Sequence, residues 1–292
     1  MNQRKKQRIN QRIKQRINQR LKPTIQGLKP IIAGLVLVTL FTSCGILPKK
    51  FPESSYLNMN PKELAIARED ARSLIMNLES VNQNLKTFKG IGKLKLWNNE
   101  KGQINERAAW IVSRPVSLSI VILVSGRPAM KFAADGKYLY YIDMIDPDHS
   151  LKKIRRNDPQ LDKLIYIRIK TSDIINLLSG RMPIAKHSDS IVVPDSSGYI
   201  LLLENKQRKI HQKIYFNSNK TVANKVELFD DKGVLLYRAK FESMQTINKF
   251  HVPKHLVITD GNNAGFSIYI SRYMANVPVP ESAFVLTLPP KI

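Results

Sequence analysis

Apolar residues recur at helical spacing in the first part of the chain that has a folding pattern. From Asn60-Pro61 to Lys86 an apolar residue returns every three or four positions, and proline suits the first position of a helix. The positions that a helix would place on one face are Leu64, Ala67, Ala71, Leu74, Ile75, Leu78 and Val81. This pattern predicts one long amphipathic helix.

The period then changes to two, which is typical of strands with one buried face. The clearest run is residues 116–124, where apolar side chains at even positions alternate with Ser117 and Ser119. Asp135-Gly136 is a strong signal for a tight turn between two such runs. The alternating runs lie at 93–96, 108–112, 116–124, 130–134 and 138–142. They predict an antiparallel meander with one apolar face.

The middle of the chain interrupts this alternation at Asp146-Pro147-Asp148 and Asn157-Asp158-Pro159. Thr171-Ser172-Asp173 can then cap a short apolar helix, and Gly180 can end it. Strand patterns resume at 199–203, 210–216, 222–229, 234–241, 252–258 and 266–273. Turn residues at 231–233 and 260–262 separate neighbouring runs and predict hairpins.

About eleven strands in one sheet should curl or close rather than stay flat. The apolar face of the sheet needs cover, and the two helices are the cover available. We therefore expect an α+β fold over residues 61–292, in which a strongly curved antiparallel sheet forms an incomplete β-barrel of about eleven strands with a helical lid. Any part of the hollow that the helices leave unfilled would be an apolar pocket.

The first 43 residues have the parts of an export signal. Residues 1–30 carry ten basic and no acidic side chains, and an apolar run follows from Ile31 to Phe41. That run is shorter than the roughly 20 apolar residues that a transmembrane helix needs. A basic segment, a short apolar segment and small residues before a cleavage point make a secretory signal. We expect residues 1–43 to be a signal peptide with an extended basic n-region.

The cysteine after this signal indicates lipidation. Phe41-Thr42-Ser43-Cys44-Gly45 resembles the bacterial lipobox, in which the chain is cut before the cysteine and its thiol is acylated. Cys44 is the only cysteine of the chain, so an exported protein could not pair it internally. We expect Cys44 to carry the lipid and residues 44–60 to be a tether; an incidental cysteine in an ordinary signal is the alternative.

The chain is strongly basic before and after this cleavage. Removing the ten basic residues of the signal lowers the formal net charge from +24 to +14. Export argues against nucleic acid as the partner, so anionic lipid headgroups or an acidic protein fit the charge better. A solvated basic surface without any partner is the alternative.

The sequence contains no recognisable catalytic or metal-binding motif. A nucleophile elbow, a phosphate-binding glycine loop and a dinucleotide fingerprint are all absent from it. His251 and His255 lie in a strand pattern, where four residues span about 13 Å, too far to share one zinc ion. Asp143, Asp146 and Asp148 have the pattern of a solvated turn. We expect neither an enzyme nor a cofactor.

Four segments resemble the LolA/LolB lipoprotein-sorting family over residues 62–290. They are Leu85–Leu94 after the first helix, Phe132–Leu139 around a turn, Ile175–Ile184 at the central helix with its Gly-x-Pro-like exit, and Val252–Ile258 in a proline-led strand. The resemblance implies an apolar cavity that holds acyl chains of lipoproteins without covalent chemistry. It further implies a LolB-like, monomeric protein of the outer membrane, facing the periplasm, that receives lipoproteins from a LolA-like periplasmic carrier.

Two groups of residues follow from this resemblance. The loop between the third and fourth strands of the family's receptor protrudes and carries an exposed leucine; here the matching residues are Ser125, Gly126 and Arg127, without that leucine. The candidate cavity residues combine the sheet and the two helices: Leu74, Leu78, Leu118, Ile120, Met130, Phe132, Tyr140, Leu177 and Leu178. For any single one of them an ordinary core position is the stronger interpretation, so the set is a hypothesis about one face of the sheet. The alternative function is a structural or sensory envelope lipoprotein whose pocket is closed or binds a protein segment.

Overall fold

The computed structural model describes residues 59–98, 102–145, 150–161, 167–207, 209–262 and 264–287. The predicted signal peptide, Cys44 and nearly all of the predicted tether lie outside these ranges. All the described elements belong to one compact unit, Ser55–Ile292.

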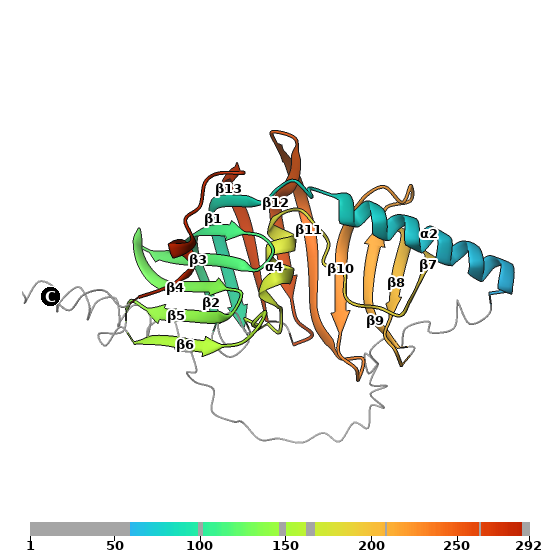
Figure 1. Cartoon of the computed structure of the whole chain (residues 1–292), viewed down its shortest axis with the longest axis horizontal. Coiled ribbons are helices and arrows are strands. Elements are labelled where there is room, and N and C mark those ends of the chain that lie inside the picture. The colour runs from blue at the N-terminus through green and yellow to red at the C-terminus, as the bar shows by residue number, and fades with distance from the viewer. Residues whose placement is uncertain are drawn as a thin grey trace, which may run out of the picture. The chain divides into compact units, whose positions relative to one another are not determined.

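A single antiparallel sheet of thirteen strands forms the body (Figure 1). Its order is β6-β5-β4-β3-β2-β1-β13-β12-β11-β10-β9-β8-β7, so two meanders meet where β1 pairs with β13. The strands are β1 (Thr87–Asn98), β2 (Gly102–Ser113), β3 (Ser117–Val124), β4 (Arg127–Asp135), β5 (Tyr138–Asp143), β6 (Leu151–Arg155), β7 (Asp189–Asp195), β8 (Gly198–Glu204), β9 (Ile210–Phe216), β10 (Ala223–Phe229), β11 (Leu235–Ile247), β12 (Phe250–Thr259) and β13 (Gly265–Ala275). The helices are α2 (Pro61–Ser80), α4 (Thr171–Leu178) and the short 3-10 helix η1 (Glu281–Phe284).

The predicted open, curved sheet with helical cover is confirmed, with two strands more than expected. The additional strands, β6 and β7, are the two edges of the sheet. Most of β6 is exposed and basic, and β7 has four consecutive buried residues, Ser190–Val193. Apolar and polar residues do not alternate in either strand, because an edge strand need not have one buried and one solvent-exposed face. Period-two patterning therefore did not reveal them.

Helix α2 begins where the sequence predicts and ends earlier than expected. Asn60 and Glu63 form a reciprocal capping box, with the Glu63 backbone N–H donating to Asn60 Oδ1 at 2.9 Å. The helix stops at Ser80 rather than at Lys86, and Asn82 adopts a positive φ of 48°. The Asn82 side-chain amide then donates to the carbonyl oxygens of Ser179 and His251. These bonds fix the turn that leads into β1.

The N-terminal half of α2 packs against the edge strand β7. Ala67 lies in a small apolar cluster with Ile191, Val193 and Leu202. Beside this cluster, Arg68 forms a bidentate ion pair with Asp189 at the start of β7. Edge strand β7, which the sequence pattern did not reveal, is therefore covered by α2, which the pattern predicted.

Substituting Asn60 with alanine is expected to destabilise the protein by about 1 kcal/mol, because the N-cap bond to Glu63 is lost. Urea denaturation of the two chains would measure this difference. Asn60→Ser, which keeps a capping oxygen, is the matched control and should recover most of the loss. Equal stability of all three chains would contradict the capping role.

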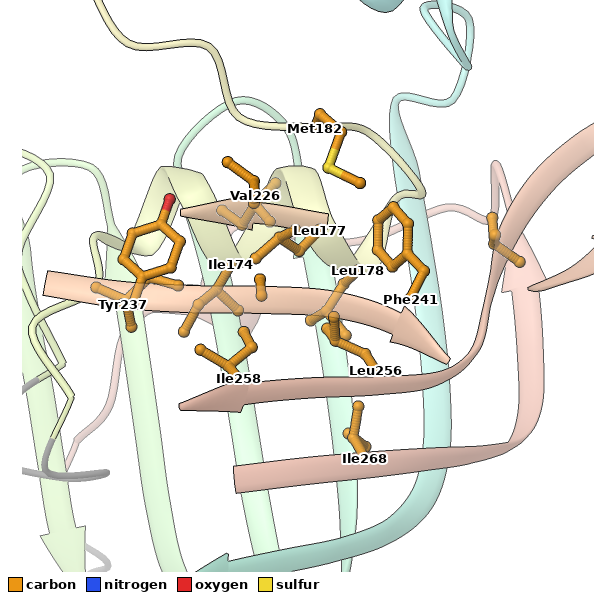
Figure 2. Packing of buried hydrophobic residues seen from close by; sticks show 14 of the residues in the cluster. Ile174, Leu177, Leu178, Met182, Val226, Tyr237, Phe241, Leu256, Ile258 and Ile268 are labelled. Atoms are coloured by element: carbon orange, nitrogen blue, oxygen red, sulfur yellow. The ribbon is translucent and has the colours of Figure 1, made fainter. Parts of the chain in front are cut away.

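Helix α4 lies on the connection between the two edges of the sheet. The chain leaves β6 at one edge and enters β7 at the other, so residues 156–188 must cross one face. We call this the inner face. Figure 1 shows α4, in yellow, between the two meanders, where it contacts both β3 and β12. Its buried side chains pack into the main core with residues of β10, β11 and β12 (Figure 2).

Gly180 ends α4 where only glycine fits. Its φ is +75°, and a Cβ there would overlap the carbonyl oxygen of His251 on β12. The backbone after α4 thus approaches β12 directly, and the predicted end of the helix at Gly180 is confirmed.

On the opposite, outer face, the C-terminal segment covers part of the first meander. Helix η1 contacts β3 and β4, and its Phe284 is buried. This cover explains why the outer face of β4 and β5 carries buried side chains such as Ala133, Tyr140 and Ile142.

Candidate functional site: an apolar cavity beside helix α4

A cavity lies between α4 and the inner face of the first meander. Its lining is apolar throughout the described residues. The residues that line it are Leu94, Ala108, Trp110, Ile120, Ile122, Met130, Phe132, Tyr141, Leu161, Ile174, Leu178, Phe266 and Ile268. Strands β1 to β5 and β13 therefore form one wall, and Ile174 and Leu178 of α4 form the facing wall.

Strand register explains why these side chains converge. Ile120 pairs with Trp110 on one side and with Phe132 on the other, and Phe132 pairs with Tyr141. Directly opposed residues in an antiparallel sheet point to the same face. The four side chains thus form one row across β2, β3, β4 and β5, and α4 lies across from it.

The enclosed part of the cavity is small, with a volume of about 70 Å³. An engineered cavity of about 150 Å³ is known to hold benzene. As it stands, the cavity could hold a short part of a hydrocarbon chain.

Four of the nine predicted cavity residues line the cavity: Ile120, Met130, Phe132 and Leu178. Leu74 and Leu78 of α2, together with Leu118 and Leu177, are buried in the main core but do not line it. Figure 2 shows Leu177 beside Val226, whereas Leu178 lies nearer Leu256. Helix α2 is therefore not a wall of this cavity, and the lid that faces it is α4.

Tyr140 lies on the other face of the sheet from the one expected. Its pairing partner is Ala133, whereas Tyr141 pairs with Phe132 and lines the cavity. The Tyr140 hydroxyl donates to Asp135 at 3.0 Å on the outer side. The two-residue turn at Gly136-Lys137 sets this register. The sequence could have revealed the pairing, because counting outward from the turn pairs Phe132 with Tyr141. The even-position alternation of Tyr138, Tyr140 and Ile142 instead reflects burial on the outer face.

The predicted protruding loop is not a protruding loop. Val124 pairs directly with Arg127, so only Ser125 and Gly126 connect β3 to β4. Both have positive φ, 51° and 77°, as a tight hairpin turn requires. The turn holds no exposed apolar side chain, although Arg127 is exposed there.

Other lining residues were not assigned from the sequence, although the strand patterns contained several of them. Leu94, Ala108, Trp110 and Ile122 occupy the apolar positions of their alternating runs. Choosing among the apolar positions required knowing which strands face α4. Phe266 and Ile268 lie beside β1 only because β13, the last strand of the second meander, pairs with β1.

Three polar contacts hold α4 in place over the inner face. The carboxylate of Asp158 accepts hydrogen bonds from the backbone N–H and hydroxyl of Ser172, at 2.9 and 2.8 Å. The buried Tyr237 hydroxyl donates to Asp173 at 3.1 Å. At the other end, the Tyr273 hydroxyl donates to the Leu178 carbonyl oxygen. Burial raises the pKa of the Asp173 carboxyl to about 6, against a smaller lowering by the Tyr237 hydrogen bond.

Two further features are absent from the described residues. No helix among them is long and apolar enough to cross a membrane. No three His, Cys, Asp or Glu side chains within the described ranges gather as metal ligands would.

Comparisons with known proteins relate this chain to others by fold. No protein-family model matches the sequence, and no curated protein does. A DUF1329 family protein from Desulfovibrio piger has a similar structure, with a TM-score of 0.54 and 10% identity over 75% of this chain and 97% of that one. A LolA superfamily protein from Nitrosomonas europaea aligns with a TM-score of 0.49 and 14% identity, over 74% of this chain and 97% of that one. A putative outer membrane lipoprotein-sorting protein domain from Vibrio parahaemolyticus aligns with a TM-score of 0.46 and 12% identity, over 77% and 97%. At 10% identity, the likeness to the DUF1329 family protein shows a shared fold and nothing about function.

Proposed function

We propose that this protein is a lipid-anchored, LolB-like lipoprotein of the outer membrane that holds acyl chains of lipoproteins beside α4 and takes part in their localisation. The observation that carries the proposal is the uniformly apolar lining of the cavity. A hydrocarbon chain offers no hydrogen bonds, so a cavity surface formed by apolar atoms suits it, whereas a polar ligand would lose its bonds to water there.

The remaining parts of the proposal come from the sequence. The lipid on Cys44 would hold the protein at the membrane, facing the periplasm, and a LolA-like carrier would supply the cargo. The resemblance of four sequence segments to the LolA/LolB family supports this role, and the function needs no catalytic group.

Binding a longer acyl chain requires α4 to move away from the sheet, because the enclosed part of the cavity is small. The outward movement would separate Ile174 and Leu178 from Phe132 and Ile120. The buried apolar surface that α4 loses would be replaced by contact with the ligand, so the exchange need not cost much free energy.

The proposal is tested by filling the cavity. Ile122 lines it and is only partly buried, so Ile122→Phe should occupy the space with little loss of stability. We expect a fluorescent palmitate analogue to bind the chain from residue 44 carrying Cys44→Ser, and Ile122→Phe to weaken this binding by at least about tenfold. Fluorescence titration measures the dissociation constant.

The matched control is the next residue on the same strand. Leu123 points to the outer face, so Leu123→Phe adds the same bulk outside the cavity and should leave binding unchanged. Equal affinity of the two phenylalanine variants would exclude the cavity as the binding site. Mass spectrometry of lipids that co-purify with the same chain would identify the natural ligand.

A second function has one observation in its favour. The small enclosed volume fits a structural or sensory lipoprotein whose core is closed. A protein with this second function would not bind the palmitate analogue, so the same fluorescence titration of the parent chain distinguishes the two proposed functions.

A further inference from the structure

The outer face of the sheet carries a patch of basic side chains that spans both meanders. We define the outer-face basic patch as Lys93 and Lys95 of β1, Arg107 of β2, Lys225 of β10, and Arg238 and Lys240 of β11. Lys93 and Lys95 alternate with the inward-facing Leu94 and Leu96, and Lys225 precedes the buried Val226 of the core. Each of these basic residues therefore points away from α4.

Strand register places basic residues of the two meanders in one row, with uncharged residues of β12 and β13 between them. One row of directly paired residues runs from Lys225 to Lys240, Val257, Ser267 and Lys95. The row crosses β10, β11, β12, β13 and β1, and β2 lies beside it. With neighbouring strands about 4.8 Å apart, the patch is about 24 Å wide.

Like charges oppose each other at two places in this patch. Lys225 pairs directly with Lys240, and Lys93 pairs directly with Arg107. Directly opposed like charges destabilise a sheet. Burial lowers the pKa of Lys225, and its neighbours Arg238 and Lys240 lower it further, against the opposite pull of Glu227. The fold thus keeps an arrangement that costs stability, which an anionic partner would relieve.

The acidic groups of this region neutralise only part of the charge. The buried carboxylate of Glu227 accepts from Arg238 at 2.6 Å and from the Tyr215 hydroxyl at 2.7 Å. Lys240 contacts Glu242 at 3.1 Å. Lys93, Lys95 and Arg107 are exposed and have no ion-pair partner within 4.0 Å among the described residues.

Aromatic side chains stand among these cations. Tyr269 is 47% exposed and pairs with Lys93 on one side and His255 on the other, and the Lys254 ammonium lies 5.2 Å from its ring centre. The Lys95 ammonium lies 5.7 Å from the ring centre of Trp97. Amphipathic Tyr and Trp rings beside Lys and Arg are typical of proteins that contact the headgroup region of a bilayer.

We propose that the outer-face basic patch docks the protein on an anionic bilayer by contacting phospholipid headgroups. Its width suits a surface of many charges better than a single phosphate group, and its aromatic side chains favour a lipid surface over an acidic protein. This contact is separate from the acyl-chain cavity, because the two lie on opposite faces of the sheet.

The test uses vesicles of phosphatidylcholine with and without phosphatidylglycerol, and the chain from residue 44 carrying Cys44→Ser. We expect co-sedimentation only with the anionic vesicles, and its loss as salt screens the charges. The double variant Lys93→Glu/Arg107→Glu should reduce the partition coefficient by at least about tenfold. The matched control is Lys62→Glu/Lys232→Glu, which changes the net charge equally at two exposed positions away from the patch.

Stability measurements separate docking from folding. Lys93→Glu alone places opposite charges across from each other, so it should weaken vesicle binding while leaving the melting temperature equal or higher. Equal vesicle binding by the patch and control double variants would overturn the proposal, as would equal binding to vesicles without phosphatidylglycerol. Capture of an acidic protein by a chain that binds no vesicle would also overturn it. Ile122→Phe should not affect docking, so failure here is distinguishable from failure of the acyl-chain proposal.

Discussion

Trp110→Ala is expected to lower the free energy of unfolding by about 3–5 kcal/mol, the usual cost of truncating a buried aromatic residue. Trp110 is 2% exposed, at the point where the sheet, α4 and the cavity meet. Its indole ring lies over Gly90 of the neighbouring strand, where any Cβ would overlap the ring. Removal would therefore expose both the glycine backbone and the wall of an existing cavity, which the surrounding strands can only partly close.

Trp110→Phe is the informative control for this substitution. The Trp110 Nε1 group is buried and has no hydrogen-bond partner among the described residues. Phenylalanine removes that unsatisfied donor and keeps most of the ring, so it should retain most of the stability. Urea denaturation of the three chains measures the differences, and a loss below about 1 kcal/mol for Trp110→Ala would contradict the packing role.

The second large effect concerns the pH dependence of stability through Asp173. The pKa of this buried carboxyl is about 6 in the folded chain, against 3.8 for an ordinary aspartate, because burial disfavours its charge. Asp158 on the preceding loop raises the pKa slightly, and Lys170 and the Tyr237 hydroxyl oppose it. The folded state therefore binds the proton more tightly than the unfolded state does.

The sign follows from this linkage. Above pH 6 the carboxyl is ionised in both states, and its burial costs the folded state about 3 kcal/mol. As pH falls from about 6 to about 4, the folded protein takes up the proton first, so this contribution makes it more stable. Asp173→Asn cannot ionise, and its stability should lack this gain. The difference between the two chains, followed by urea denaturation from pH 7 to pH 3, should change by about 3 kcal/mol, because the full contribution is reached only below the pKa of the unfolded state.

The control for Asp173 is an exposed carboxyl on another element. Asp231 is exposed in the turn between β10 and β11, so Asp231→Asn shows what the loss of one surface carboxylate does to the same measurement. A constant difference between Asp173→Asn and the parent across the whole pH range would show that the Asp173 carboxyl titrates normally.

The sequence determined the local elements of this protein. Alternation identified eleven of the thirteen strands, helical spacing identified α2, and Asn60-Pro61 and Gly180 marked a helix start and a helix end. These predictions succeeded because each depends on neighbours within a few residues along the chain. The sequence also placed Ile120, Met130 and Phe132 on the apolar face that lines the cavity, since alternate residues of a strand point to the same face.

The tertiary structure decided how the faces of different strands combine. Tyr141, and not Tyr140, lies beside Phe132 in the cavity wall. The outer face of β5 also carries buried side chains, and the alternation of apolar residues cannot distinguish that burial from burial in the core. The pairing of β1 with β13 brought Phe266 and Ile268 to the cavity from the far end of the chain, and α4 rather than α2 became its lid. The register of β1 against β2 also determined that Lys93 lies directly opposite Arg107, a pair of like charges. Each of these features joins residues distant in sequence, and such contacts are set by the packing of the whole sheet.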